Sequence, residues 1–252
     1  MTKQQNVGYQ PRTYRNSIGR NHLKRFTVMV KETDLLLYAS VNLEKKAREI
    51  VLEQRGYLEE YIRCNPLFVT SFAPWETAGP APAIVREMAI AGQKTGVGPM
   101  AAVAGGIAEA VGKNLLKHAD EIIVENGGDI FVRTNAPVTM GIFAGNSPLS
   151  MRVGLTIASA DRPMAVCTSS GTIGHSMSMG VSDAVCVVAD SCPLADAAAT
   201  SIGNHVNSKT KIRDAIDFGN KISGIAGIII IKNDRIGMWG DLDLVPFQGK
   251  KS

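Results

Sequence analysis

The chain has no long hydrophobic segment, and this excludes several classes of protein. Its longest apolar runs are residues 225–231 and the small-residue stretch 99–111. Both are shorter than the roughly 18–20 residues that cross a membrane. The first ten residues, MTKQQNVGYQ, contain no apolar core, so we expect neither a secretory signal nor a lipid-anchoring cysteine. The sequence therefore favours a cytoplasmic, globular protein without a membrane partner.

Cysteine is scarce as well, and its spacing excludes the common metal motifs. The four cysteines form no C-x-x-C pair, which argues against a zinc or a redox site. Three of them lie in apolar or strand-like segments, so we expect unpaired thiols in a reducing compartment. They are Cys64, Cys167, Cys186 and Cys192. A Gly-x-Ser-x-Gly motif is also missing, so a serine hydrolase has little support.

Acidic residues are absent from the first 31 positions, which carry seven Lys and Arg, whereas the whole chain has a net charge of only +4. Such a segment could attract the phosphates of a nucleotide or a nucleic acid. It could equally protect the edge of a solvated β-hairpin. Few aromatic residues are interleaved with these charges, which speaks against nucleic acid as a partner.

The patterns that are present predict a mixed α/β, or α+β, fold with a single domain over residues 1–252. A chain of this length can bury one substantial core. Apolar alternation predicts strands within residues 9–40, so that basic N-terminal strands (1–40) pack on the rest. A long helix should follow Asn42 and another should run from about 82 to 94. The remaining helices and strands alternate irregularly, which predicts mixed sheets flanked by helices.

An unusual helix is expected after Pro99. Residues 92–112 contain six glycines, and alanine stands at five further positions. A helix with small side chains on nearly all sides allows another group to approach its backbone closely. That group is either another helix or sheet, or a flat ligand.

The segment SCPLADAAATSIGN carries a candidate metal site. Asp196 and Thr200 are four residues apart on an expected helix, so both side chains should lie on one face. A carboxylate and a hydroxyl are hard oxygen ligands, and Mg²⁺ takes a few of these together with water and phosphate. Alternatively, Thr200 bonds a helical carbonyl and Asp196 is a solvated charge near the helix start.

Two further segments are candidate ligand-binding elements. In Asn126-Gly127-Gly128-Asp129, paired glycines between strand-like residues let a ligand come close, and Asn126 and Asp129 could bond a heterocycle or a ribose. The same residues also suit a plain β-hairpin turn. In the second segment, a strand ends in a hydroxyl-rich loop of residues 168–175 whose N–H groups could hold phosphate. His175 could act there as a general base, or it could be structural.

The order of these segments resembles the core of the ApbE-like flavin transferases. The resemblance covers about residues 80–235 and rests on GPMAAVAGGIAEAVG, NGGDI, TSSG and ADAAAT. Over the whole chain, including KETDLLLYA and VGPMAAVAG, the sequence is similar to uncharacterised protein family 0280 (UPF0280), which implies an ApbE-like fold. The transferases use Mg²⁺ to cleave the diphosphate of FAD, and they attach FMN to a Ser or Thr of a target protein.

The resemblance implies roles for individual residues. Asp196 and Thr200 match the metal-binding residues of the family. Gly127, Gly128 and Asp129 match a strand that lines the flavin site, and the T-S-G element beside the diphosphate is matched by Thr168, Ser169 and Gly171. His175 lies near the family's histidine. The family's Lys-Gly-Tyr is replaced by residues 104–107, Ala-Gly-Gly-Ile, and its Asp-Pro-x-Thr-Gly is missing.

These matches and departures leave two functions open. The first is an enzyme with Mg²⁺-dependent chemistry at the diphosphate of FAD or a related nucleotide, either FMN transfer to a protein acceptor or hydrolysis. The second is a non-catalytic protein that binds a flavin or another planar cofactor. The sequence also leaves open whether the chain forms a homodimer.

Overall fold

The computed structural model describes residues 22–170, 182–206 and 212–248. The helices are α1 (Glu44–Cys64), α2 (Leu67–Thr70), α3 (Ala83–Thr95), the 3₁₀ helix η2 (Pro99–Ala102), α4 (Val103–Leu115), α5 (Cys192–His205) and α6 (Ile212–Gly219). The strands are β1 (Lys24–Val30), β2 (Thr33–Ala39), β3 (Ile122–Asn126), β4 (Asp129–Arg133), β5 (Val138–Gly141), β6 (Val153–Ile157), β7 (Met164–Ser169), β8 (Ala184–Ala189), β9 (Ile225–Lys232), β10 (Arg235–Gly240) and β11 (Asp243–Pro246).

The strands form two sheets. The larger has eight strands in the order β1-β2-β3-β4-β7-β8-β9-β10, and the smaller has three in the order β11-β6-β5. Every strand pair among the described residues is antiparallel. The expected mixed α/β (α+β) fold, with sheets flanked by helices, is confirmed, and its sheets are antiparallel. Short hairpins connect β1 to β2, β3 to β4 and β9 to β10, and such connections produce antiparallel pairs.

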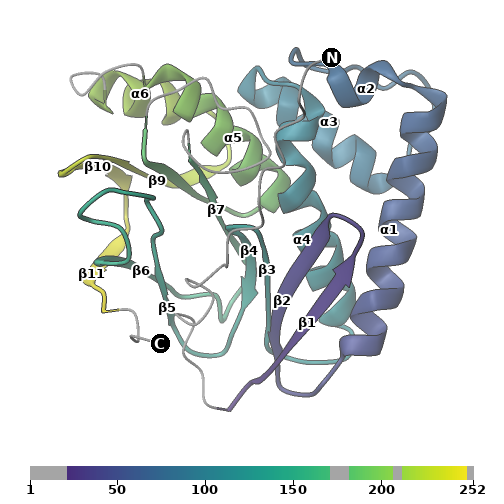
Figure 1. The fold of residues 1–252 in the computed structure, drawn as a ribbon, viewed down its shortest axis with the longest axis horizontal. Coiled ribbons are helices and arrows are strands. Elements are labelled where there is room, and N and C mark those ends of the chain that lie inside the picture. Colours follow the sequence, from purple (N-terminus) through teal and green to yellow (C-terminus); the bar gives the residue numbers. More distant parts are fainter. Residues whose placement is uncertain (1–21, 171–181, 207–211, 249–252) are drawn as a thin grey trace, which may run out of the picture.

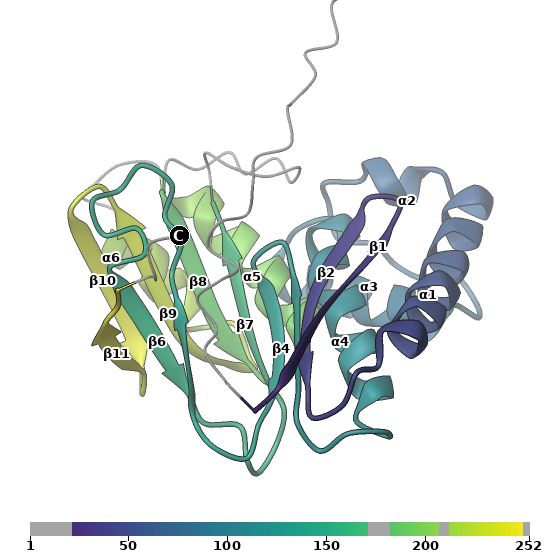
Figure 2. The same cartoon turned by 60° about the horizontal axis from the view of Figure 1, so that its bottom comes forward.

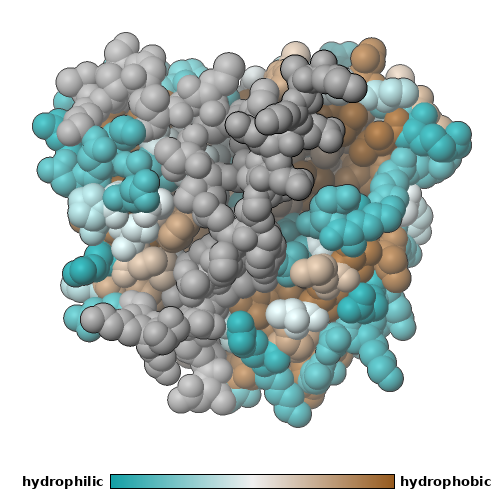
Figure 3. Space-filling view, in the orientation of Figure 1, coloured by the Kyte–Doolittle hydropathy of each residue, from teal (hydrophilic) through white to brown (hydrophobic). Residues whose placement is uncertain are grey.

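The molecule has three layers, with the large sheet in the middle. Helices cover one face of this sheet, and the small sheet lies against the other (Figures 1 and 2). Side chains alternate along each strand, so one strand serves two cores. Val124 and Phe131 belong to the core under the helices, whereas Ile123 and Val132 belong to the core between the sheets. In the space-filling view, polar side chains lie along the outer edge on the side of α1 (Figure 3).

The basic N-terminal segment is described only from residue 22 onward. β1 and β2 form an antiparallel hairpin at one edge of the large sheet, as expected, and β2 joins it to β3. Arg48 of α1 donates a hydrogen bond to the carbonyl oxygen of Met29, which ties this edge to the helical layer. Residues 1–21, with most of the basic charges, lie outside the described part. None of the helices in that part is both long and apolar enough to cross a bilayer.

The space beside the glycines of α4 is occupied by other parts of the protein. A Cβ atom on Gly105 would lie 2.4 Å from the carbonyl oxygen of Cys192 in α5, and one on Gly112 would lie 2.1 Å from the Phe131 ring. Gly106 faces Met88 of α3 more loosely, at 3.4 Å. Helix and sheet packing, the first of the two explanations, thus accounts for the small residues of this helix.

Candidate functional site

The two glycines of the NGGD segment form the turn of a hairpin. β3 and β4 pair up to Asn126 and Asp129, which leaves Gly127 and Gly128 as a two-residue loop. Both have positive φ, 69° and 114°, the combination that favours glycine in tight hairpins. The hairpin interpretation is therefore right. A Cβ atom on Gly128 would lie 3.4 Å from the carbonyl oxygen of Thr168, so the turn also lies against the end of β7.

Asp129 opens β4 directly after this turn and is buried. It lies opposite Cys167 in the register and shares the helix-covered face of the sheet with Phe131. Burial raises the pKa of Asp129 to about 7, although hydrogen bonds from the Cys167 thiol and the Thr168 backbone favour its charged form. The charge of Glu125 raises this pKa further. A carboxyl group in these surroundings therefore titrates near neutral pH.

Asp196 lies in the second turn of α5 and is half-buried. Its Oδ2 accepts a hydrogen bond from the backbone N–H of Gly105 at 2.9 Å, and the Ala104 backbone also bonds it. Burial raises the pKa of Asp196 well above its ordinary value, and the charge of Asp129 adds to the increase. The interpretation of Asp196 as a solvated charge near a helix start is therefore wrong, because its carboxylate is bonded to the start of a different helix.

A short chain of contacts connects these elements. The side-chain amide of Asn126 donates to the carbonyl oxygen of Ala104 at 3.0 Å, and the next residue, Gly105, bonds Asp196. The amide nitrogen of Asn126 therefore bonds protein. We call Asp129 and Asp196 the carboxylate pair. Thr200 follows Asp196 by one turn on α5, is buried, and shares its helix face through the i, i+4 spacing.

At the end of β7, the neighbouring residues Thr168 and Ser169 point to opposite faces of the large sheet. Ser169 lies on the same face as Cys167 by strand alternation. Its Oγ is buried and has no hydrogen-bond partner in the described part of the chain. Thr168 points to the opposite face, where its side chain bonds the Cys186 thiol. Only the backbone of Thr168 therefore reaches Asp129.

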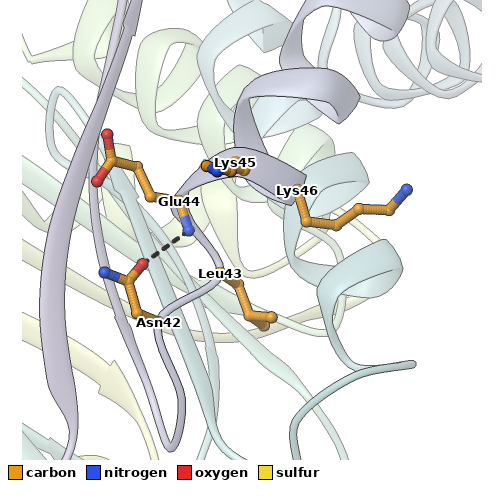
Figure 4. A pocket seen from close by; sticks show the side chains of 5 residues that line it. All are labelled: Asn42, Leu43, Glu44, Lys45 and Lys46. Atoms are coloured by element: carbon orange, nitrogen blue, oxygen red, sulfur yellow. Dashed lines mark hydrogen bonds between the residues drawn. The ribbon is translucent and has the colours of Figure 1, made fainter.

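Two predicted site residues, Gly171 and His175, lie outside the described residues. The pocket drawn in Figure 4 contains none of the predicted site residues either. It is lined by residues 42–46 at the start of α1, where the side-chain oxygen of Asn42 accepts a hydrogen bond from the Glu44 N–H at 2.9 Å. That bond confirms the expected helix start.

The carboxylate pair suits a hard divalent cation. Over residues 22–170, 182–206 and 212–248, no Lys or Arg forms an ion pair with Asp129 or Asp196. Those ranges also contain no group of three or more His, Cys, Asp or Glu side chains arranged as a metal site. Mg²⁺ needs only one or two carboxylates when water and phosphate complete its shell. Asp196 and Thr200, with Asp129 nearby, therefore fit Mg²⁺, and the buried Ser169 hydroxyl leaves a polar atom for a ligand.

Sequence reasoning missed the buried carboxylate of Glu109. It lies in α4, it is 3% exposed, and its Oε2 accepts a hydrogen bond from the backbone N–H of Cys192. Its other oxygen bonds Lys113 at 2.5 Å. Only one local signal was available, namely a charged residue inside a run of Gly and Ala. Its partner is 83 residues away in the sequence, so spacing could not reveal the contact.

Solved structures place the fold among the ApbE flavin transferases. The flavinyl transferase ApbE of Pseudomonas stutzeri, in its apo form, matches with a TM-score of 0.58 at 13% identity, covering 88% of this chain and 95% of that one. The ApbE protein of Thermotoga maritima matches with a TM-score of 0.54 at 13% identity, covering 85% and 96%. At such low identity the likeness establishes the fold.

The sequence comparisons define the family. The family model described as AbpE bacteria matches residues 15–226. A UPF0280 protein of Methanocaldococcus jannaschii is 44% identical over 221 residues, which are 85% of this chain and 90% of the relative. A UPF0280 protein of Methanococcus maripaludis is 39% identical over the same shares of both chains. The chain belongs to the AbpE bacteria family, as an ApbE-like UPF0280 protein, and the expected resemblance is confirmed.

Proposed function

We propose that the chain binds the diphosphate of FAD or a related nucleotide together with Mg²⁺, and that it cleaves this diphosphate. The observation that carries the proposal is the carboxylate pair: two carboxylates with raised pKa values interact, and no described basic side chain balances their charge. Burying charges without partners costs stability, so such a pair is typical of a functional site. The fold of flavin transferases supports flavin as the nucleotide.

Each residue of the site has a role in this proposal. Asp196 and Thr200 would hold Mg²⁺, which neutralises phosphate charge and stabilises the charge that develops on a leaving phosphate. The N–H groups of the Gly127-Gly128 turn and the Ser169 hydroxyl would bind the nucleotide. Asp129, whose pKa is about 7, would donate a hydrogen bond to a ligand oxygen in its protonated form or accept a proton from a ligand in its ionised form. His175 and Gly171 keep their predicted roles within the proposal.

The bonds involved are the same for both reactions. Cleavage of the FAD diphosphate by water gives FMN and AMP. Transfer uses a Ser or Thr hydroxyl of a protein acceptor in place of water, and the products are AMP and a protein with FMN in phosphoester linkage. AMP is thus released in either case, which makes it the product to measure.

A second candidate function is binding without catalysis. It is favoured by residues 104–107, where the resemblance implies Lys-Gly-Tyr and this chain has Ala-Gly-Gly-Ile. None of these four residues is basic, and a Cβ atom on Gly105 would clash with α5, so no side chain could be added there. The carboxylate pair and Mg²⁺ would then hold the nucleotide intact.

Product analysis separates the two candidates. Purified protein is incubated with FAD and Mg²⁺, and AMP and FMN are measured by chromatography, with EDTA as the metal-free control. The variant Asp196→Asn should release no AMP. Asp190→Asn is the matched control, because Asp190 is an exposed carboxylate just before α5 that pairs with Arg162. Bound but intact FAD would support the binding protein, and absence of both binding and cleavage would contradict the proposal.

A further inference from the structure

Helices α4 and α5 are joined by two reciprocal hydrogen bonds. Asp196 of α5 accepts from the Gly105 N–H in the first turn of α4, and Glu109 of α4 accepts from the Cys192 N–H in the first turn of α5. The first N–H groups of a helix have no partner within it and carry partial positive charge. Each helix therefore supplies a carboxylate to an N–H group in the first turn of the other.

These two bonds fix the relative position of two helices that already touch. Gly105 lies so close to α5 that an added Cβ atom would be 2.4 Å from the Cys192 carbonyl oxygen and 2.9 Å from the Asp196 Cβ. A glycine surface packed on a helix backbone limits how closely the helices approach, but it has no side chain that interlocks and prevents sliding along the axis. The bond from Glu109 to Cys192 resists such sliding, because a slip along the axis would break it.

The Glu109 side chain is held in place by burial and by a contact with Lys113. Its side chain is almost fully buried, and its second oxygen bonds Lys113, whose own side chain is 55% exposed. Burial is the largest influence on the pKa of Lys113 and lowers it, but the bond to Glu109 and the negative charges of Glu109 and Glu87 together raise it. The charge of Glu109 is thus balanced within α4, and its Oε2 remains available for α5.

We propose that Glu109 is a positioning residue for Asp196: by holding the first turn of α5 against α4, it sets where the Asp196 carboxylate lies for Mg²⁺. The inference rests on the proposed function and extends it to a residue that cannot touch the metal or the nucleotide from its buried place. Partners that orient metal ligands commonly change metal affinity or activity by about 10–100-fold when they are replaced.

Two conservative substitutions distinguish the effect of the side-chain length of Glu109 from the effect of its charge. Glu109→Asp keeps the charge but is one methylene shorter, so it loses the bond to Cys192. Glu109→Gln keeps the length and an acceptor oxygen. We expect the Mg²⁺-dependent affinity for ADP, measured by calorimetry, to fall at least about 10-fold in Glu109→Asp and to stay within about threefold of the wild type in Glu109→Gln. ADP binding in EDTA should not change.

A matched control shows that the effect is not a general loss of stability. Glu121 is also buried and accepts a backbone N–H, from Asn135 at 2.9 Å, but it precedes β3 at the end away from the Gly127-Gly128 turn. Glu121→Asp should leave the gain in ADP affinity on adding Mg²⁺ unchanged. Circular dichroism verifies folding, and Glu109→Met, which fills the volume without an acceptor, replaces Glu109→Asp if the latter does not fold.

The outcomes distinguish the inference from the proposed function. If the wild type shows no Mg²⁺-dependent binding, the proposed function itself fails. If the wild type binds and the variant without the acceptor binds equally well, Glu109 does not position Asp196 and the inference is overturned. A loss of the same size in Glu121→Asp would also overturn it, because the effect would then reflect stability alone.

Discussion

Asp129 of β4 and Asp196 of α5 interact although neither has a described basic partner. Burial is the largest cause of the raised pKa of Asp196, and the charge of Asp129 raises this pKa further. The two residues are 67 positions apart, on different layers of the fold. Their interaction brings the NGGD hairpin and the ADAAAT helix together, and we expect it to cost stability.

The variant Asp196→Asn should be more stable than the wild type in EDTA at pH 8. The substitution removes a half-buried carboxyl group whose charged form is disfavoured by burial and by Asp129, yet it keeps an oxygen that can accept from Gly105. Asp196→Ala also removes the charge but leaves the Gly105 N–H without this acceptor, which costs about 0.5–2 kcal/mol at a helix start. Urea unfolding of the three proteins tests the order. Equal stability of Asn and Ala variants would show that the bond to Gly105 contributes nothing.

Asp129 should make the metal-free protein less stable as the pH rises. Its carboxyl group has an ordinary pKa of 3.8 and a folded-state pKa of about 7. Between these values the folded state keeps a proton that the unfolded state has lost, so the stabilisation is full below about pH 4 and is lost as the pH passes 7. The unfolding free energy of the wild type minus that of Asp129→Asn should therefore fall across this range. A constant difference would contradict the assigned burial.

The substitution Gly105→Ala should destabilise the protein by about 1–3 kcal/mol, the usual cost of overpacking. Its new Cβ would meet backbone atoms of Cys192, which cannot move aside as a flexible side chain could. Gly56→Ala in α1 is the matched control, because nothing lies within 4 Å of its added Cβ. Alanine there should stabilise by about 0.5–1 kcal/mol through helix propensity. Both are measured by urea unfolding, and similar effects of the two substitutions would refute close packing of α4 on α5.

Thiol reactivity should separate one cysteine from the other three. Cys64 is exposed, whereas Cys167, Cys186 and Cys192 are buried, and none forms a disulfide. Burial raises the pKa of Cys186 to about 11 and also raises the pKa values of Cys167 and Cys192, so their reactive thiolates are suppressed. A thiol reagent should label one group in the folded protein and four after denaturation. Fewer than four groups in the denatured, non-reduced protein would reveal a disulfide.

The sequence predicted elements better than their contacts. Strand alternation and helix signals located the NGGD hairpin and α5, because these patterns are local. Local sequence could not show whether the small residues of α4 face a ligand or protein, nor whether Asp196 is solvated. Both depend on how closely α4 approaches α5. Glu109 was missed for the same reason: its acceptor role exists only once Cys192 is beside it. The orientation of Thr168 away from Asp129 likewise follows from register, which the sequence alone left open.

The most direct test of the central claim is calorimetric titration of FAD into the wild type and Asp196→Asn, with Mg²⁺ and with EDTA. We expect Mg²⁺ to strengthen binding by the wild type at least about 10-fold, the size expected when a metal ligand is in place. We expect no such gain in Asp196→Asn, whose amide is a poorer ligand for a hard cation. Equal affinity of the two proteins in Mg²⁺ would contradict the account, because Asp196 would then serve only to bond Gly105.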